Sequence, residues 1–264
     1  MNLFDLRQGS APLIVSIPHA GLEIPDDCTT GLRSITLARH DADWWLPQLY
    51  DFAAELDATI IINRISRTVI DANRDPSGVS LYPGQFTTGL CPVETFDGEP
   101  LYAGGAPDTD EIARRRVRYF EPYHAALAGE IERLRAQNPS IVLYDCHSIR
   151  SEIAPLFKGI LPNFNIGTND GTSCGPAIAD RVLRICEAAE GFTAVANGRF
   201  KGGYITRHHG DPGSGVNAIQ MELACRGYML EPAMATTENW PTNYDVDYAA
   251  PMRKVLRSVL ESFV

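Results

Sequence analysis

Short apolar runs alternate along the chain with longer stretches in which apolar residues recur at helical spacing. The runs rich in β-branched residues predict buried strands at 12–17, 58–62, 141–144, 192–196 and 218–223. Helical spacing with capping residues at the ends predicts helices over 44–56, 109–136, 176–191 and about 248–262. Short strands that alternate with helices are typical of an α/β fold with a largely parallel sheet.

Three polar segments between these elements are predicted to be loops. They cover 75–108, 162–175 and 198–215, and they are rich in Gly together with Pro, Thr, Asn or Asp. The ligand crevice of a parallel sheet lies beyond the carboxyl ends of its strands. We therefore expect the crevice to hold the polar side chains near these ends, which are His19, Asn63, His147 and Glu222 or its neighbours.

Two histidines, His19 and His147, each come just after a predicted buried strand. A lone histidine is more often structural. Two imidazoles at two strand ends of one sheet can nevertheless converge on a metal, and neutral imidazole is the commonest zinc ligand. A catalytic zinc site needs about three protein ligands and an open position. The residues leave the third ligand open among four acidic side chains: Glu23, Asp41, Asp43 and Asp145.

The carboxylates near these histidines also have other interpretations. Asp43 equally suits the N-cap of the predicted helix that follows it, and Asp145 could orient a ligand rather than bind the metal. Glu222 stands in an otherwise apolar strand. Either the strand is half exposed and Glu222 faces water, or Glu222 is buried with a partner and acts as the general base. Cys146 is a weaker candidate for a nucleophile, because neighbours along a strand point to opposite faces.

The cations of this chain are almost all arginines, with twenty Arg and three Lys, for which genomic base composition is the simplest explanation. Several lie in or near the predicted loops: Arg64, Arg67, Arg74, Arg150, Arg199, Lys201 and Arg207. Guanidinium groups bind carboxylates through two parallel hydrogen bonds, so arginines on loops at a crevice edge suit a dicarboxylate. Any one of them could equally be structural.

The overall charge and the cysteines limit the partners and the location. A formal net charge of −10 and a pI of about 5.1 argue against nucleic acid or an anionic membrane surface as the main partner. A local basic pocket can still bind a small anion. The six cysteines form no Cys-x-x-Cys pair, and neither a leader pattern nor a membrane-spanning apolar stretch is found. A reducing cytoplasm is the expected location.

Seven motifs follow one another along almost the whole chain. They are Ser-Ile-Pro-His-Ala-Gly (16–21), Asp-Ala-Asp-Trp (41–44), Ser-Arg-Thr-Val-Ile-Asp-Ala-Asn-Arg-Asp-Pro-Ser-Gly (66–78), Leu-Tyr-Pro-Gly-Gln (81–85), Asp-Cys-His-Ser-Ile-Arg-Ser (145–151), Gly-Arg-Phe-Lys-Gly-Gly-Tyr-Ile-Thr-Arg (198–207) and Gln-Met-Glu-Leu (220–223). Together they closely resemble the N-formylglutamate amidohydrolases (deformylases) of histidine degradation. The third and sixth motifs are the most specific.

The resemblance implies a single domain over residues 1–264 with a mixed central sheet flanked by helices, similar to the zinc carboxypeptidases and aspartoacylases. It implies hydrolysis of N-formyl-L-glutamate to L-glutamate and formate with one Zn²⁺ per chain. It supports His19 and His147 as metal ligands and Glu222 as the general base. It also implies a set of substrate-binding residues: Asn73 and Arg74, joined by one or more of Arg67, Arg150 and Arg207.

One departure affects the third metal ligand. The carboxypeptidases carry Glu three residues after their first His, whereas position 22 here is Leu. We therefore assign the acidic ligand to Asp43, in the Asp-Ala-Asp-Trp motif. Two rival hypotheses remain. The same site could act on another N-acyl amino acid or an N-formimino compound, or the chain could be a metal-free protein that binds dicarboxylates through its arginines.

Overall fold

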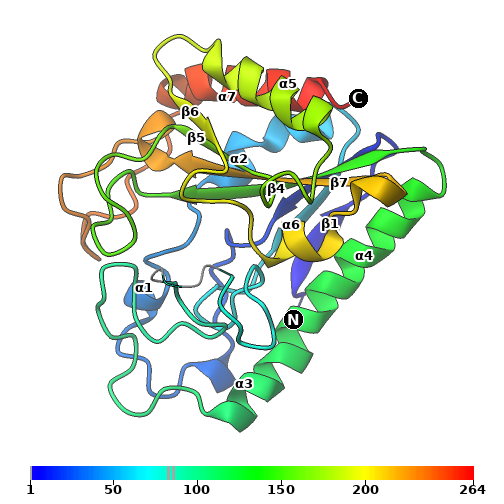
Figure 1. The fold of residues 1–264 in the computed structure, drawn as a ribbon. Coiled ribbons are helices and arrows are strands. Elements are labelled where there is room, and N and C mark those ends of the chain that lie inside the picture. Colours follow the sequence, from blue (N-terminus) through cyan, green and yellow to red (C-terminus); the bar gives the residue numbers. More distant parts are fainter. Residues whose placement is uncertain (1, 82–83, 85–86) are drawn as a thin grey trace.

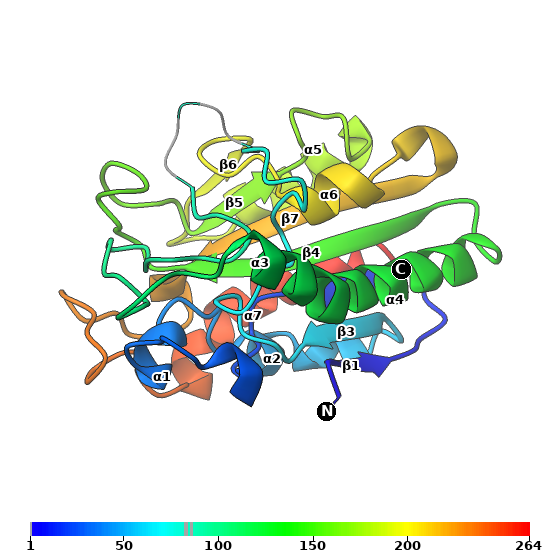
Figure 2. The same cartoon turned by 90° about the horizontal axis from the view of Figure 1, so that it is seen from below.

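The structure, a computed structural model, describes residues 2–81, 84 and 87–264. Of the motif at 81–85, Tyr82, Pro83 and Gln85 lie outside the described residues. Seven strands form one sheet, in the order β1-β3-β2-β4-β7-β5-β6, and helices cover both of its faces (Figures 1 and 2). This arrangement confirms the predicted α/β fold with a mixed sheet flanked by helices.

The sheet has a parallel centre with antiparallel pairings toward its edges. Its strands are β1 (Phe4–Arg7), β2 (Leu13–Ile17), β3 (Thr59–Asn63), β4 (Ile141–Ile149), β5 (Phe164–Gly167), β6 (Ala194–Ala196) and β7 (Val216–Ala224). β3, β2, β4 and β7 run parallel to one another. β1 is antiparallel to β3 at one edge, while β5 is antiparallel to β7 and parallel to β6 at the other. The carboxyl ends of the four central strands therefore meet at one edge of the sheet.

The helices divide between the two faces of the sheet. They are α1 (Ile35–Ala38), α2 (Leu46–Leu49), α3 (Thr109–Arg115), α4 (Glu121–Arg135), α5 (Pro176–Glu187), α6 (Tyr204–His209) and α7 (Val246–Glu261). Short 3₁₀ turns cover Asp26–Cys28, Asp51–Ala54, Pro212–Ser214 and Cys225–Gly227. α2, α5 and α7 pack on one face in the largest apolar cluster, and α4 and α6 pack on the other face (Figure 1). Both faces are thus covered, as expected for strands that are apolar on both sides.

The alternation of side chains along β4 assigns its residues to the two faces. All nine residues of this strand are buried. Val142, Tyr144 and Cys146 face the cluster under α5 and α7, whereas Leu143 faces α4. Cys146 therefore points away from His147, and burial raises the pKa of its thiol well above the usual value. Both facts argue against a thiol nucleophile.

Only part of the helix predicted over 44–56 forms. Trp45 adopts a left-handed backbone conformation with φ of 64°, so the chain turns there before α2 begins. Pro47 stands in the first turn of α2, which is four residues long and is followed by a 3₁₀ turn rather than by more α-helix. The carboxylate of Asp43 therefore does not cap a helix, and it is available to the site described below.

The structure also differs from the prediction at the end of one strand and in three elements that were not predicted. The strand predicted at 141–144 continues to Ile149, so His147 lies within β4 and not after it. Polar residues did not end the strand because they alternate with apolar ones and β4 keeps its pairing with β7. The predicted loops at 162–175 and 198–215 contain β5 and α6, and β1 was not predicted. By contrast, the described residues of 75–108 contain no named helix or strand, in agreement with the predicted loop.

The helix predicted over 109–136 is continuous but not uniform. α3 passes into a π-helical turn at Arg116–Phe120 and then into α4. Pro122 stands in the first turn of α4 and lacks a backbone N–H. A prolyl ring cannot join the regular hydrogen-bond ladder, and the wider π turn accommodates it. α4 then packs Tyr123, Leu127 and Leu134 against the sheet.

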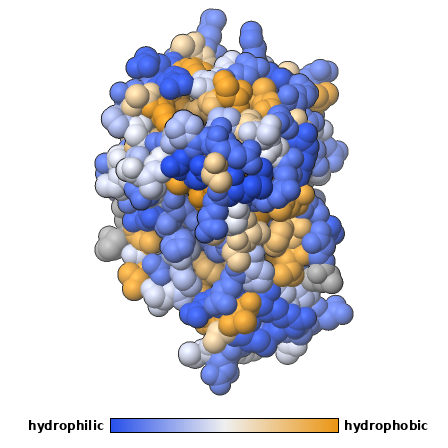
Figure 3. Space-filling model, turned by 90° about the vertical axis from the view of Figure 1, so that its right-hand side faces the viewer, coloured by the Kyte–Doolittle hydropathy of each residue, from blue (hydrophilic) through white to orange (hydrophobic). Residues whose placement is uncertain are grey.

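The surface is mixed in polarity. On the face shown in Figure 3, apolar groups are interrupted by hydrophilic ones and form no continuous belt. Within the part of the chain that the structure describes, no helix has the length and apolar character needed to cross a membrane.

Candidate metal-dependent active site

The site lies at the carboxyl ends of β2, β4 and β7, on the face of the sheet that α4 and α6 cover. The first half of this face is apolar, with Ile14, Leu143 and Ala218 in the cluster under α4. The same side-chain alternation then brings five polar residues onto this face: Ser16, Asp145, His147, Gln220 and Glu222. In the β4–β7 register, Asp145 lies opposite Gln220 and His147 lies opposite Glu222. The alternation of side chains along these strands thus places apolar residues in the core and, further along the same face, polar residues in the site.

Two turns bring the other two potential ligands to His147. His19 follows β2 by two residues, and Asn63 at the end of β3 donates a hydrogen bond to the carbonyl of Pro18 at 3.1 Å. The backbone N–H of Asp43 donates to the carbonyl of His19 at 3.0 Å. These bonds fix both turns against the sheet, and all three side chains are buried.

The three side chains present their ligand atoms to a common point. His19 Nδ1 and His147 Nδ1 lie 3.2 Å apart, and Asp43 Oδ2 lies 3.7 Å and 3.3 Å from these two nitrogens. Ligands at about 2.0–2.1 Å from a tetrahedral zinc ion are about 3.3 Å from one another. Among the described residues, this is the one group of three His, Cys, Asp or Glu side chains that could hold a metal ion. The spacing of its atoms fits one face of a tetrahedral site.

A buried carboxylate lies behind each imidazole. His19 Nε2 is 2.7 Å from Asp71 Oδ1, and His147 Nε2 is 2.8 Å from Asp145 Oδ2. Each carboxylate accepts the Nε2 proton, which leaves the Nδ1 lone pair for a metal. Such a carboxylate–histidine pair is the usual way in which a protein fixes the tautomer and direction of a metal-binding imidazole. The position of Asp145 fits the orienting role that the sequence left as an alternative.

The charges around this group favour a cation. Burial and the charge of Arg67 lower the pKa of His19, which keeps this imidazole neutral and able to bind a metal. Burial alone would lower the pKa of His147, but Asp145, Asp43 and Glu222 outweigh it and raise the pKa well above its usual value. The site thus draws positive charge toward His147. A divalent cation held at Nδ1 would supply that charge, so the donor set fits a metal such as zinc.

Glu222 lies beside His147 on the neighbouring strand. Glu222 is 7% exposed. The alternative in which the strand is half exposed and Glu222 faces water is therefore wrong. Burial raises the pKa of Glu222 to about 7, although the charge of His147 opposes the shift. A carboxylate with a pKa near neutrality can both accept and return a proton, as a general base must. The burial of Glu222 and the raised pKa of its carboxyl group suit the predicted role of a general base.

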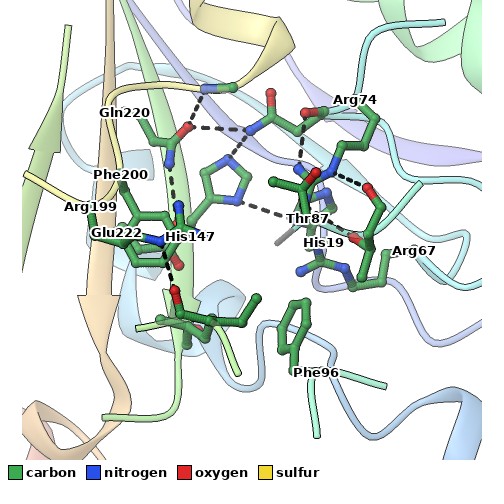
Figure 4. Close-up of a pocket in the computed structure, with 16 residues that line it drawn as sticks. His19, Arg67, Arg74, Thr87, Phe96, His147, Arg199, Phe200, Gln220 and Glu222 are labelled. Carbon is green, nitrogen blue, oxygen red and sulfur yellow. Dashed lines mark hydrogen bonds between the residues drawn. The ribbon is translucent and has the colours of Figure 1, made fainter. Parts of the chain in front are cut away.

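His19, His147 and Glu222 line a pocket with about 560 Å³ of empty space, its mouth included (Figure 4). Arg67, Arg74 and Arg199 supply the positive charge of its wall, and Phe96, Leu156 and Phe200 supply apolar surface. Arg67 is buried, donates to Asp71 Oδ2 at 2.7 Å and lies over the ring of Phe96. Arg74 donates from Nε and Nη2 to Thr88, and its side chain is 21% exposed. The pocket thus suits a small anion with an apolar part.

The structure does not bring every predicted residue to this pocket. Of the predicted substrate-binding set, Arg67, Asn73 and Arg74 line it, but the described lining includes neither Arg150 nor Arg207. Arg150 pairs with Asp97 at 2.6 Å in a neighbouring cavity. Arg207 donates from Nε to the carbonyl of Gly202.

The alternative acidic ligands also lie elsewhere. Glu23 pairs with Arg64, and Asp41 accepts a hydrogen bond from the backbone N–H of Phe96 at 2.7 Å. Neither belongs to the group around His19 and His147, so the geometry favours Asp43 as the third ligand.

Two site residues, Asp71 and Gln220, had no assigned role in the sequence analysis. Asp71 belongs to the motif at 66–78 and Gln220 to the motif at 220–223. For Gln220, the alternation of polar and apolar residues along the strand could have indicated its place. Asp145 and His147 alternate along β4 as Gln220 and Glu222 alternate along β7. Polar residues at alternate positions of two adjacent strands could have indicated one polar face. Asp71 carries no comparable local signal, because its place depends on the folding of the turn at 66–74.

The fold and this site define an α/β protein with a candidate metal centre of the hydrolytic type. Residues 11–229 match the family model described as N-formylglutamate amidohydrolase. An N-formylglutamate deformylase from Pseudomonas putida is 45% identical over 264 residues, which is 100% of this chain and 96% of the relative. A second from Pseudomonas aeruginosa is 44% identical over the same shares of both chains. The chain belongs to the N-formylglutamate amidohydrolase family, as its motifs predicted.

Solved structures agree with this assignment. The crystal structure of an N-formylglutamate amidohydrolase from Ralstonia eutropha JMP134 has a TM-score of 0.79 and 25% identity, and the match covers 99% of this chain and 97% of that one. A gene product of Agrobacterium tumefaciens matches with a TM-score of 0.72 and 20% identity, over 99% of this chain and 96% of that one. At that identity, the second match supports the fold alone.

Proposed function

We propose that this chain hydrolyses N-formyl-L-glutamate to L-glutamate and formate with one divalent cation, zinc in the first place, held by His19, Asp43 and His147. The observation that carries the proposal is the convergence of His19 Nδ1, His147 Nδ1 and Asp43 Oδ2 to within 3.7 Å, beside a buried glutamate. The names of the relatives supply the substrate.

In this proposal the metal would activate the formyl group and the water, and Glu222 would transfer the proton. A bound zinc ion would polarise the formyl oxygen and lower the pKa of water in the site. Glu222, with a pKa near 7 in the metal-free protein, would take a proton from the attacking water at its carboxylate and return it to the departing amine of glutamate. The buried guanidinium of Arg67, which pairs with Asp71 and lies near Asp43, would stabilise negative charge as it develops on the formyl oxygen.

The basic wall of the pocket would hold the carboxylates of the substrate. Arg74 is the first candidate, because it lines the pocket and part of its side chain is exposed there. Arg199 lines the same pocket from another loop. Two separate arginines match a substrate with two carboxylates, which an acyl amino acid with a neutral side chain lacks. Arg150 and Arg207 have no part in this proposal.

We also infer that the reaction takes place in the cytoplasm, as the last step of a histidine degradation route. The six cysteines are all buried free thiols, which is usual for proteins of a reducing compartment. The substrate named for the relatives supports the route.

A substrate panel tests the proposal. Release of formate from N-formyl-L-glutamate and N-formyl-L-alanine, of acetate from N-acetyl-L-glutamate, and of formamide or ammonia from an N-formimino compound would be measured with the purified protein. We expect N-formyl-L-glutamate to have the highest kcat/KM, with N-formyl-L-alanine much lower for want of the second carboxylate. If another compound is hydrolysed with a higher kcat/KM, that compound and not N-formyl-L-glutamate is the preferred substrate. Tight binding without hydrolysis of any compound would favour a dicarboxylate-binding protein.

A further inference from the structure

Two side-chain amides lie between the candidate metal site and the candidate base. Asn73 and Gln220 are both buried, at 3% exposure each. Asn73 Nδ2 lies 3.4 Å from Asp145 Oδ2 and 3.3 Å from Gln220 Oε1. Gln220 Nε2 in turn donates to Glu222 Oε2 at 3.2 Å (Figure 4). The two amides therefore form a continuous hydrogen-bonded path from the carboxylate behind His147 to Glu222.

Backbone donors settle which way each amide points. Asn73 Oδ1 accepts from the N–H of Ile205 at 2.7 Å, and Gln220 Oε1 accepts from the N–H of Gly203 at 2.8 Å. A backbone N–H can only donate, so each amide must present its oxygen to α6 or to the residue before it. The NH₂ groups must then face the carboxylates of Asp145 and Glu222. The backbone N–H donors thus fix which amide atom is the oxygen and which is the nitrogen in both side chains.

The contacts of Asn73 leave it little capacity to bind substrate. Its oxygen bonds to Ile205, and its NH₂ group faces Asp145 and Gln220. The nearby His147 Nε2, at 3.0 Å, carries the proton that it gives to Asp145 and so cannot accept from Asn73. Asn73 thus acts within the protein, whereas the resemblance implied a substrate anchor.

Close packing holds this amide pair in place. A Cβ atom added at Gly203 would lie 2.3 Å from Asn73 Nδ2, a separation that real Cβ atoms essentially never show. Glycine at this position therefore lets the first turn of α6 approach Asn73 closely enough for the hydrogen bond to Ile205. The N–H of Tyr204 also donates to the backbone carbonyl of Asn73, at 3.3 Å. The start of α6 thus packs on Asn73 and Gln220 through three consecutive N–H groups, two of which donate to the side-chain amides and one to the backbone carbonyl of Asn73.

We propose that Gln220 is the positioning residue of the base: it aims Glu222 into the site, while Asn73 and the first turn of α6 hold Gln220. The inference rests on the proposed function, because it assigns Glu222 the role of general base. Glu222 Oε2 is held by Gln220, and the carboxylate keeps one orientation toward the pocket. A base misplaced by about 1 Å can cost about 100-fold in rate, so this hydrogen bond acts on kcat more than on substrate binding.

Two variants of Gln220 test the proposal, with a control on the same strand. Gln220→Met keeps the length of the side chain and removes the amide. Gln220→Glu keeps an oxygen for Gly203 and replaces the donor to Glu222. The control is Asn217→Leu, which removes a buried amide of β7 whose partners, Gly175, Ser140 and Ile141, lie outside the pocket. Steady-state kinetics with N-formyl-L-glutamate and metal content would be measured for all three variants and the wild type.

The expected result is a fall of about 10- to 100-fold in kcat for both Gln220 variants, with nearly unchanged KM and full metal content. Asn217→Leu should keep the wild-type kcat even if it lowers stability. Wild-type kcat in either Gln220 variant overturns the inference, as does an equal loss in Asn217→Leu or a loss of metal from the Gln220 variants. If the wild type itself does not hydrolyse N-formyl-L-glutamate, the proposed function fails and the inference with it. An active wild type with unaffected Gln220 variants overturns the inference alone.

Discussion

Asp71 is the buried carboxylate that we expect to aim His19 at the metal. Its Oδ1 accepts from His19 Nε2 at 2.7 Å and from the N–H of Asn73 at 2.9 Å, and its Oδ2 accepts from Arg67 Nη2 at 2.7 Å. Burial raises its pKa, but the charges of Arg74, His19 and Arg67 outweigh burial and hold the pKa well below the usual value. Asp71 is therefore ionised at neutral pH, and the proton of His19 stays on Nε2.

The substitution Asp71→Asn keeps the size of the side chain and removes its charge. If the amide oxygen takes the Oδ1 position, the NH₂ group faces the guanidinium of Arg67, donor against donor. If the amide turns over, the NH₂ group faces His19 Nε2 and drives the imidazole proton to Nδ1, the predicted ligand atom. Loss of such an orienting partner costs about 10- to 100-fold in metal affinity. That range corresponds to about 1.4–2.7 kcal/mol of binding free energy.

The same substitution should lower the free energy of unfolding of the metal-free protein. Among the ion pairs of the described residues, it leaves Arg67 only the longer contact with Asp43, at 3.5 Å. Removing one partner of a buried ion pair costs about 3–5 kcal/mol. Urea unfolding of the metal-free wild type and variant would measure this loss.

The zinc affinity of the folded protein would be measured at 25 °C by competition with a chromogenic chelator. The control is Asp41→Asn, which removes a neighbouring carboxylate that bonds to the N–H of Phe96 and lies outside the ligand group. We expect weaker zinc binding in Asp71→Asn and unchanged binding in Asp41→Asn. Wild-type affinity in Asp71→Asn would refute the argument that Asp71 orients a metal-binding His19.

The remaining predictions concern the base, the substrate anchor and the pair His124 and His209, in which His124 Nδ1 lies 3.1 Å from His209 Nε2. Glu222→Gln should keep metal and substrate binding but lower kcat by about 10²- to 10⁴-fold, and near-normal turnover would exclude Glu222 as the base. Arg74→Gln should raise KM by about 10- to 150-fold, through loss of a charged hydrogen bond of about 1.5–3 kcal/mol, and an unchanged KM would remove Arg74 from substrate binding. Burial lowers the pKa of His124 to about 4, and burial with the charges of His124 and His208 lowers that of His209 to about 3. As the pH falls below about 6.5, the unfolded chain takes up these protons before the folded chain does. The unfolding free energy should therefore decrease by up to about 1.4 kcal/mol per pH unit for each histidine as the pH falls from about 6.5 to 4. Urea titrations of the wild type and His124→Gln would show whether this slope depends on the pair.

The fold and the meeting of the two histidines could be predicted because both depend on short-range patterns. The apolar runs that became β2 and β4 are long enough to identify, and neighbouring parallel strands end at the same edge of a sheet. His19 and His147 therefore had to lie near each other. The length of β4 was missed because its second half alternates polar and apolar residues, and only the partner strand β7 shows that it stays paired.

The choice among acids and arginines could not be predicted, because it depends on how distant loops fold. Asp43 reaches His147 from a turn whose position is fixed by the hydrogen bond between the N–H of Asp43 and the carbonyl of His19, 24 positions earlier in the chain. Arg150 follows His147 by three residues but pairs with Asp97, 53 positions away in the chain. No local pattern distinguishes it from Arg74 or Arg199, which line the pocket.

The dependence of hydrolysis on metal tests the central claim most directly. The measurement is formate release from N-formyl-L-glutamate by the purified chain, before and after complete removal of metal, together with the metal content of each sample. We expect one zinc per chain, loss of activity when the metal is removed, and recovery of activity when one equivalent is added back. We also expect His147→Gln, which removes a proposed ligand near the carboxyl end of β4, to recover little activity at that ratio. Full activity in a sample shown to be free of divalent metal would contradict the proposal that hydrolysis depends on a cation held by His19, Asp43 and His147.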